Sequence, residues 1–147
     1  MSKVFLHKSD RSYNLYKTGL IKLLIENLFK QENVPLQRVD YIFCSDDFLL
    51  NINQKHLSHN TLTDIITFPL SNNELVRGEI YISVDRIKEN AKTFQVHYQS
   101  ELLRVMIHGA LHLCGYKDKK KLQQVEMRNK EDYYLKKYNV PREASPY

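Results

Sequence analysis

The chain has 147 residues, a length that suits one domain with its own core, so we expect a single domain over residues 1–147. It has two cysteines, no run of the roughly 20 apolar residues needed to span a bilayer, and no apolar signal-peptide centre near its start. These features argue against disulfide-rich secreted and membrane-spanning classes and favour a cytoplasmic protein. The formal net charge of +5 favours polyanionic partners such as RNA without selecting one.

The first part of the chain predicts two strands and two helices. Between residues 14 and 30 apolar side chains recur at three- and four-residue spacing, as in an amphipathic helix. Ser45, followed by two aspartates, is a good N-cap, and we expect a helix from there through about His56 with Phe48 and Leu49 turned inward. The strands are expected at residues 3–7 and 39–44.

The middle of the chain predicts an antiparallel pair of strands followed by a helix. The β-branched run at residues 64–68 and the alternating run at residues 78–83 form the pair, and residues 71–73 would turn the chain between them. Ser83 can then cap a helix. The inward residues of that helix would be Ile87, Ala91 and Phe94.

Two further helices are expected. Residues 99–113 are apolar around most of the helix circumference, which indicates a largely buried element with a narrow polar stripe of Glu101, Arg104, His108 and His112. Residues 119–138 predict a final helix with a lysine-rich outer face. Its inward residues would be Leu122, Val125, Tyr134 and Leu135. The whole pattern indicates an α+β domain, with a small mixed β-sheet of three to four strands packed with about five helices.

The polar stripe ends in the pattern HxxxHxxGxxD, made by His108, His112, Gly115 and Asp118. Side chains four residues apart lie on one face of a helix, so the two imidazoles can share one metal ion. Gly115 can end the helix in a left-handed turn that brings Asp118 back as a third ligand. The metal site would thus lie on the buried helix and the turn after it. Cys114 is a poor ligand, because it lies about 200° around the helix from His112.

Alternative interpretations of these residues stay open. The histidines could form the solvent face of an amphipathic helix, and Asp118 could cap the final helix instead of binding a metal. If all three are ligands, they leave the fourth position of a tetrahedral zinc ion open for water, as in hydrolytic sites. Water in such sites has a pKa of roughly 7, and the charge of an aspartate ligand would make this ion a weaker acid than three histidines would.

The spacing is shared with HExxH metalloproteases, in which the glutamate after the first histidine is the general base. Here that position is Gly109, so a peptidase would need its base from elsewhere. Glu101 is too far along the helix. Asp64 and Glu79 are candidates for proton transfer, although both positions are also typical of turns and edge strands. The sequence therefore leaves the catalytic base unknown.

Lysines flank Asp118 on both sides. Lysine at a helix N-terminus opposes the helix dipole, so this cluster indicates an anionic substrate, or else a solvated helix start. The cluster consists of Lys117, Lys119, Lys120 and Lys121.

With these residues in view, the chain resembles the YbeY family of bacterial endoribonucleases, the ribosomal RNA maturation factors, whose signature is HGxLHLxGYDH. Residues 108–118 read HGALHLCGYKD. Residues 63–69 are similar to the family's TDVLSFP, residues 78–80 to its GDI, and residues 127–131 to its MxxxE. These matches cover most of residues 45–135.

The resemblance implies a small α+β domain with a zinc ion held by three histidines, acting on single-stranded RNA in ribosomal RNA processing and ribosome quality control. His108 and His112 match the first two histidines, whereas the third falls on Asp118 and the aspartate before it on Lys117. The family's LNxxYR stretch has an arginine where this chain has Leu57. Either another cation, Lys55 or Lys119, replaces this arginine on phosphate, or RNA cleavage is impaired.

The resulting hypothesis is a zinc-dependent endoribonuclease of ribosomal RNA maturation whose partners are ribosomal RNA and ribosomal particles. Its metal ligands would be His108, His112 and Asp118, and its RNA-binding residues Lys55, Lys117, Lys119, Lys120 and Lys121. One alternative is a ribosome-associated assembly factor with a structural metal, which Leu57 favours. The other is a metzincin-like metalloprotease, which rests on the spacing alone.

Overall fold

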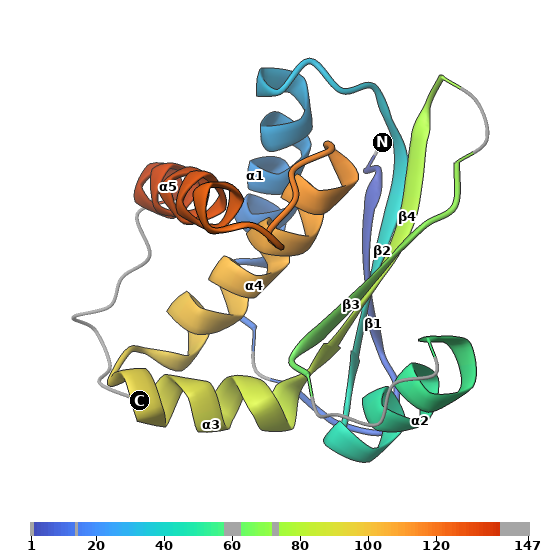
Figure 1. The fold of residues 1–147 in the computed structure, drawn as a ribbon, viewed down its shortest axis with the longest axis vertical. Helices are drawn as coiled ribbons and strands as arrows, with labels where there is room; N and C mark the ends of the chain where they lie inside the picture. The colour runs from blue at the N-terminus through green and yellow to red at the C-terminus, as the bar shows by residue number, and fades with distance from the viewer. Residues whose placement is uncertain (1, 14, 58–62, 72–73, 139–147) are drawn as a thin grey trace.

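The structure is a computed structural model that describes residues 2–13, 15–57, 63–71 and 74–138. Four strands and five helices occur in these residues (Figure 1). They are β1 (Val4–Lys8), α1 (Thr18–Gln31), β2 (Leu36–Cys44), α2 (Asp46–Leu57), β3 (Ile65–Pro69), β4 (Val76–Ser83), α3 (Val84–Phe94), α4 (Tyr98–Leu113) and α5 (Lys121–Tyr138). Asn14, where the first helix was expected to begin, and residues 72–73 of the expected turn lie outside the described residues.

The strands form one mixed sheet in the order β1-β2-β4-β3. β2 is parallel to both β1 and β4, whereas β3 is antiparallel to β4, with Ile65 opposite Ile82. The predicted antiparallel pair is thus confirmed, as is the α+β class. β2 is longer than predicted because Leu36, which is buried, already pairs with Val76.

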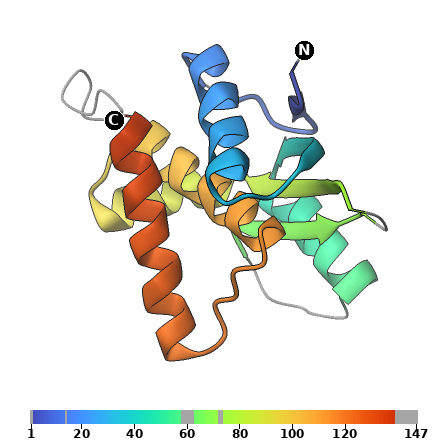
Figure 2. The same ribbon diagram turned by 90° about the horizontal axis from the view of Figure 1, so that it is seen from above.

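Helices cover both faces of the sheet. One face carries Tyr41, Ile80 and Ile82 and packs against the main core, which includes the buried sides of α1 and α4. The other face carries Cys44 and Ile66 and is covered by Leu49 of α2. Phe48 was predicted to point inward, but it is 36% exposed and lies at the margin of this smaller cluster against Tyr81. Figure 2 shows α2 and α1 on opposite sides of the sheet.

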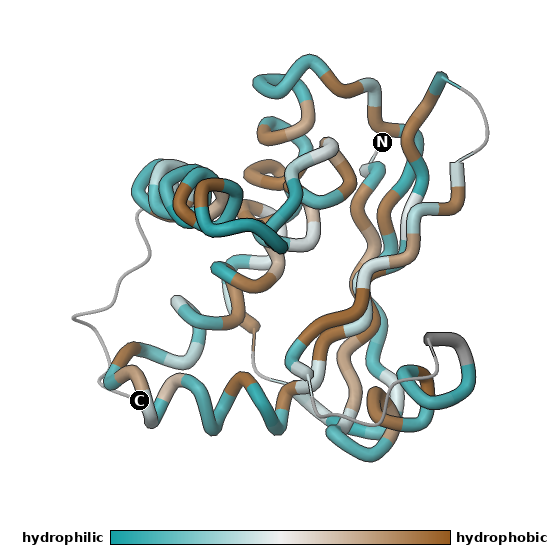
Figure 3. The backbone as a smooth tube through the Cα atoms, in the orientation of Figure 1, coloured by the Kyte–Doolittle hydropathy of each residue, from teal (hydrophilic) through white to brown (hydrophobic). Residues whose placement is uncertain are grey.

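Helix α5 contacts the core through a different strip from the one predicted. Leu122 is 84% exposed and Val125 is 52% exposed, so their predicted inward position is wrong, whereas Tyr134 and Leu135 are buried as expected. The first turns of α5 project beyond the neighbouring helices, so these residues find no surface to pack on (Figure 2). Consistent with this, α5 is largely hydrophilic, whereas hydrophobic residues are frequent in the strands and in α1 and α4 (Figure 3). The strip that does face the core consists of Met127, Glu131, Tyr134 and Leu135.

Gly109 brings α4 close to the sheet. A Cβ atom at this position would lie 2.9 Å from Cγ2 of Ile80 and 3.0 Å from Cδ1 of Ile65, so only glycine allows this approach without displacing these two side chains. The neighbouring histidine, His108, is therefore held beside the beginning of β3. Of the helices that the structure describes, none combines the length and apolarity that a membrane-crossing segment needs.

Candidate metal centre

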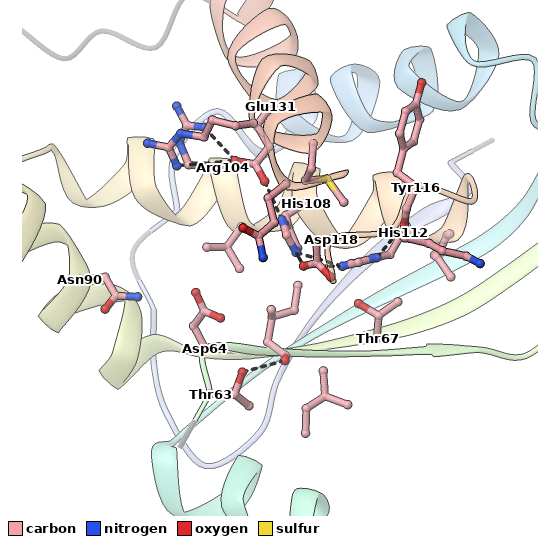
Figure 4. Close-up of a pocket in the computed structure, with 18 of the residues that line it drawn as sticks. Thr63, Asp64, Thr67, Asn90, Arg104, His108, His112, Tyr116, Asp118 and Glu131 are labelled. Atoms are coloured by element: carbon pink, nitrogen blue, oxygen red, sulfur yellow. Dashed lines mark hydrogen bonds and ion pairs between the residues drawn. The ribbon is translucent and has the colours of Figure 1, made fainter. Parts of the chain in front are cut away.

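Three side chains meet at the end of α4. The Nε2 atoms of His108 and His112 lie 3.0 Å apart, and Oδ2 of Asp118 lies 3.1 Å from the first and 3.3 Å from the second. Both histidines and the aspartate are partly exposed, and Figure 4 shows them turned toward one another. The structure therefore brings together the three residues predicted as ligands.

The turn after α4 has a specific backbone geometry. Gly115 has φ of 104°, a left-handed conformation that favours glycine. The Gly115 N–H donates to the carbonyl of His112, and the Tyr116 N–H donates to that of Leu111, which is the Schellman arrangement. This turn reverses the chain and carries Asp118 to the histidines. The predicted left-handed turn at Gly115 is confirmed.

Asp118 does not occupy the N-cap position of the last helix. α5 begins at Lys121, and the backbone N–H of Lys120 donates to Oε1 of Gln123 at 3.1 Å, so the side chain that bonds to the backbone at this helix start is Gln123. The carboxylate of Asp118 lies against the two imidazoles instead. Of the two roles that the sequence leaves open, this geometry favours the ligand.

Hydrogen bonds on the outer nitrogens orient both imidazoles. Nδ1 of His112 lies 2.9 Å from the carbonyl oxygen of Tyr116, which can only accept, so Nδ1 carries the proton. Nδ1 of His108 lies 2.6 Å from Oε2 of Glu131, a carboxylate that is 5% exposed. In neutral rings held this way, both Nε2 atoms are acceptors that face each other and the carboxylate of Asp118.

Three converging acceptors repel one another unless a cation or a proton lies among them. Ligands about 2.0–2.1 Å from a tetrahedral zinc ion are about 3.3 Å from each other. The observed separations of 3.0, 3.1 and 3.3 Å are close to this spacing. The donor set, its spacing and its oriented nitrogens thus fit a zinc ion.

Carboxylates surround His108 and create a negative field at its ring. Burial alone would lower the pKa of His108, but the hydrogen bond and charge of Glu131, with the charges of Asp118 and Asp64, outweigh burial and raise this pKa. The same negative field would stabilise a metal ion in place of the proton. Cys114 is not one of the three residues whose ligand atoms converge, and burial raises the pKa of its thiol to about 12.

The triad lies in a cleft of about 1070 Å³. Asp64 lies in this cleft, across from the histidines (Figure 4), and burial raises the pKa of its carboxyl although the nearby His108 opposes this. Glu79, the other predicted candidate for proton transfer, projects from the face of the sheet opposite to Ile80 and accepts a hydrogen bond from the hydroxyl of Tyr81 at 3.0 Å. The structure therefore places Asp64 near the triad and Glu79 away from it.

Glu101 lies on the floor of the same cleft, 7% exposed. It precedes His108 by seven residues, about 10 Å along the helix, which agrees with the prediction that it is too far to act at the triad. Burial raises the pKa of Glu101 to about 7, and the negative charge of Asp64 adds to this effect. The cleft thus holds a carboxyl group that is easily protonated.

The five lysines predicted to bind RNA occupy different places. Lys117 lines the cleft next to Asp118. Lys119, Lys120 and Lys121 are exposed on the turn and the first residue of α5, outside the cleft lining. Lys55 is exposed on α2, two residues from Asn53, which does line the cleft.

Sequence reasoning gave no role to two groups that hold the histidines. Glu131 also accepts from Nη1 of Arg104 at 2.8 Å, so the arginine in the polar stripe stabilises the carboxylate that orients His108. Tyr116 is anchored through its hydroxyl, which donates to Oε1 of Glu32 at 2.7 Å. The sequence shows the MxxxE spacing of Met127 and Glu131, but it does not show that Glu131 faces α4, because this depends on contacts between distant segments.

Comparisons with known proteins agree with this fold. The chain matches the family described as Endoribonuclease YbeY over residues 7–139. It is 48% identical over 116 residues to the Endoribonuclease YbeY of Flavobacterium psychrophilum, covering 79% of this chain and 83% of the relative. The corresponding protein of Amoebophilus asiaticus is 44% identical over 135 residues, covering 91% of this chain and 92% of the relative. The solution structure of TM1509 from Thermotoga maritima superposes with a TM-score of 0.67 at 29% identity, covering 97% of this chain and 96% of that one.

Proposed function

This chain belongs to the YbeY endoribonuclease family, and from that premise we propose that it cleaves single-stranded RNA during ribosomal RNA maturation with a zinc ion held by His108, His112 and Asp118. Residues 1–147 would form one such domain, active in the cytoplasm on ribosomal RNA and ribosomal particles. The observation that carries the proposal is the convergence of three acceptor atoms within 3.3 Å in the cleft.

A zinc ion at this site would supply Lewis-acid chemistry, because it would polarise a phosphoryl oxygen and make a water molecule more acidic. The chain itself keeps the two Nε2 atoms aimed inward through Glu131 and the carbonyl of Tyr116. Lys117, at the rim beside Asp118, would neutralise charge on a bound phosphodiester. Lys55 and the lysines at 119–121 would contact the RNA further from the reacting bond.

Asp64 is our proposed proton-transfer group. It is held at the beginning of β3 by the N–H of Ser83, which donates to its carbonyl at 3.0 Å, and its carboxyl lies in the cleft across from the triad. Burial raises its pKa, which brings a carboxyl group nearer to the pH at which it can both take and give a proton. Asp64→Asn should therefore retain the metal and lose most of the cleavage rate.

The two alternatives predict different outcomes. An assembly factor with a structural metal would bind ribosomal particles and metal, yet Asp64→Asn would change nothing measurable in RNA cleavage. A metalloprotease of the HExxH type would need a glutamate at position 109, where even a Cβ atom would lie 2.9 Å from Ile80. The structure leaves no room for that base, so the endoribonuclease is favoured.

The deciding experiment compares wild type with His112→Ala for zinc content and for cleavage of a single-stranded ribosomal RNA fragment. We expect the variant to lose most of the bound zinc and at least about 100-fold of the cleavage rate, because two ligands cannot hold the ion in a defined geometry. His7→Ala is the matched control, since His7 pairs with Asp40 at the edge of the sheet, outside the cleft. Equal zinc content or equal cleavage in wild type and His112→Ala would refute the site.

A further inference from the structure

The cleft extends well beyond the metal triad. Its floor follows α4 from Glu101 to His112, a length of about 16 Å at 1.5 Å per residue. This is several times the roughly 3.4 Å rise between stacked nucleotides. α3 and α5 supply residues to the walls at the end away from His112 (Figure 4). A polynucleotide with its phosphodiester at the triad would therefore also pass between these two helices.

On the α3 side, the cleft is lined by Asn90 and Phe94, which are four residues apart and so share one face of the helix. Phe94 is 60% exposed, although the sequence pattern predicts an inward position for it. Among the described residues, the aromatic contacts include no ring stacked on Phe94. The backbone there is well anchored, because the N–H of Val96 donates to the carbonyl of Ala91 at 3.0 Å.

On the α5 side, the cleft is lined by Gln124 and Arg128, again four residues apart on one face. The side chain of Arg128 is 65% exposed and approaches Glu131 only to 3.8 Å. Arg104 differs, since it is 19% exposed and held by Glu131 at 2.8 Å and Asp132 at 2.6 Å. Arg128 is thus a guanidinium group with most of its donors available to a ligand.

We propose that Phe94 and Arg128 form a nucleotide subsite, in which the ring of Phe94 stacks on an unpaired base and Arg128 binds a neighbouring phosphate. The subsite rests on the proposed function, because it takes the RNA strand whose phosphodiester lies at the triad. The two side chains complement the groups that a single strand exposes: the ring of Phe94 fits an open base face, and the guanidinium group of Arg128 fits a phosphate. A duplex hides its base faces, so the subsite selects unpaired RNA.

The test measures binding of a short single-stranded RNA that carries 2-aminopurine, with the probe base moved through successive positions. In zinc-loaded wild type, stacking on Phe94 should quench the fluorescence at one or two positions, and the same RNA annealed to its complement should show no quenching. Phe94→Ala should abolish the quenching and weaken binding by about 5- to 100-fold, whereas Phe94→Trp should retain both. Arg128→Gln should lower the slope of log affinity against log salt by about 0.7, a change that Phe94→Ala should not produce.

Two controls separate this subsite from the metal chemistry. Tyr133→Ala removes an aromatic side chain that is 42% exposed on α5 but does not line the cleft, and it should bind the RNA like wild type. Zinc content should be equal in Phe94→Ala and wild type. Loss of cleavage in every protein, with quenching and its dependence on Phe94 intact, would contradict the proposed function and leave the subsite standing. Absence of quenching in wild type, or equal binding by Phe94→Ala, would overturn the subsite.

Discussion

At the metal end of the cleft, both outer imidazole nitrogens are held by a neighbour, at 2.6 Å for His108 and 2.9 Å for His112. At the other end, Phe94 is 60% exposed and the side chain of Arg128 is 65% exposed. The first arrangement fixes a few atoms to within a narrow range, as bond-making chemistry requires. The second arrangement leaves the side chains of Phe94 and Arg128 accessible to a ligand. The cleft therefore has one end on α4 where hydrogen bonds fix the side chains, and another end between α3 and α5 where the side chains are exposed.

Among substitutions that keep all three proposed ligands, the largest effect on zinc affinity is expected where the hydrogen bond to His108 is weakened. Glu131→Gln keeps the shape of the side chain but removes the charge that Arg104 and His108 both contact. We expect zinc affinity to fall about 10- to 100-fold, measured by competition with a chromophoric chelator, because outer hydrogen-bond partners commonly contribute this much. Asp132→Asn is the control, since Asp132 also pairs with Arg104 but has no contact with His108 and is 56% exposed at its side chain. Equal zinc affinity in Glu131→Gln and Asp132→Asn would show that Glu131 does not support metal binding.

A large effect on folding stability, with no direct effect on the zinc ligands, is expected midway along the cleft, at Glu101. Its pKa is raised from 4.5 to about 7 in the folded protein, so the unfolded chain loses this proton first and stability falls as the pH rises from about 4.5 to 7. Glu101→Gln removes this penalty. The variant should unfold with roughly 3 kcal/mol more free energy than wild type at pH 8 and with no difference below pH 4.5. Urea titrations at both pH values measure this, and a difference that is independent of pH would contradict it.

The smallest effect is expected at the anchor of the turn. Tyr116→Phe deletes the hydroxyl that donates to Glu32 but keeps the backbone carbonyl that holds His112. Because Glu32 retains Tyr134 and Lys130 as donors, we expect a loss of about 1 kcal/mol in unfolding free energy and a change of less than about threefold in zinc affinity. Tyr133→Phe is the matched control on the exposed side of α5. If the free energy of zinc binding fell by more than the free energy of unfolding, the hydroxyl of Tyr116 would be shown to position the proposed ligands directly.

The sequence predicted the parts of this molecule that depend on local spacing. The helical repeat of His108 and His112, the left-handed turn at Gly115 and the alternation of Ile80 and Ile82 each follow from a few neighbouring residues. They also define the metal end of the cleft, which is why the three predicted ligands come together in the structure.

The sequence could not predict which faces distant segments would cover. Phe94, Leu122 and Val125 have inward helical spacing, yet the elements that would cover them do not extend that far. The order of the parallel strands and the reach of Glu131 to His108 also depend on packing between segments far apart in the chain. The rim of the cleft was therefore less predictable than its centre, because exposure depends on what the rest of the chain leaves uncovered.

The carboxylate of Glu32 accepts hydrogen bonds from Tyr116 and from Tyr134. It therefore joins the end of α1 to the turn after α4 and to the last helix, α5. Tyr134 follows Glu32 by 102 residues, which takes a ribosome about 5 to 20 s to synthesise. Until these residues are synthesised, the carboxylate of Glu32 lacks the hydroxyl donor of Tyr134, and His108 lacks its hydrogen bond to Glu131. Synthesis nearly to the end of the described chain must therefore precede full orientation of the candidate metal ligands, so a growing chain of this ribonuclease family has an incomplete site while it is still held by the ribosome.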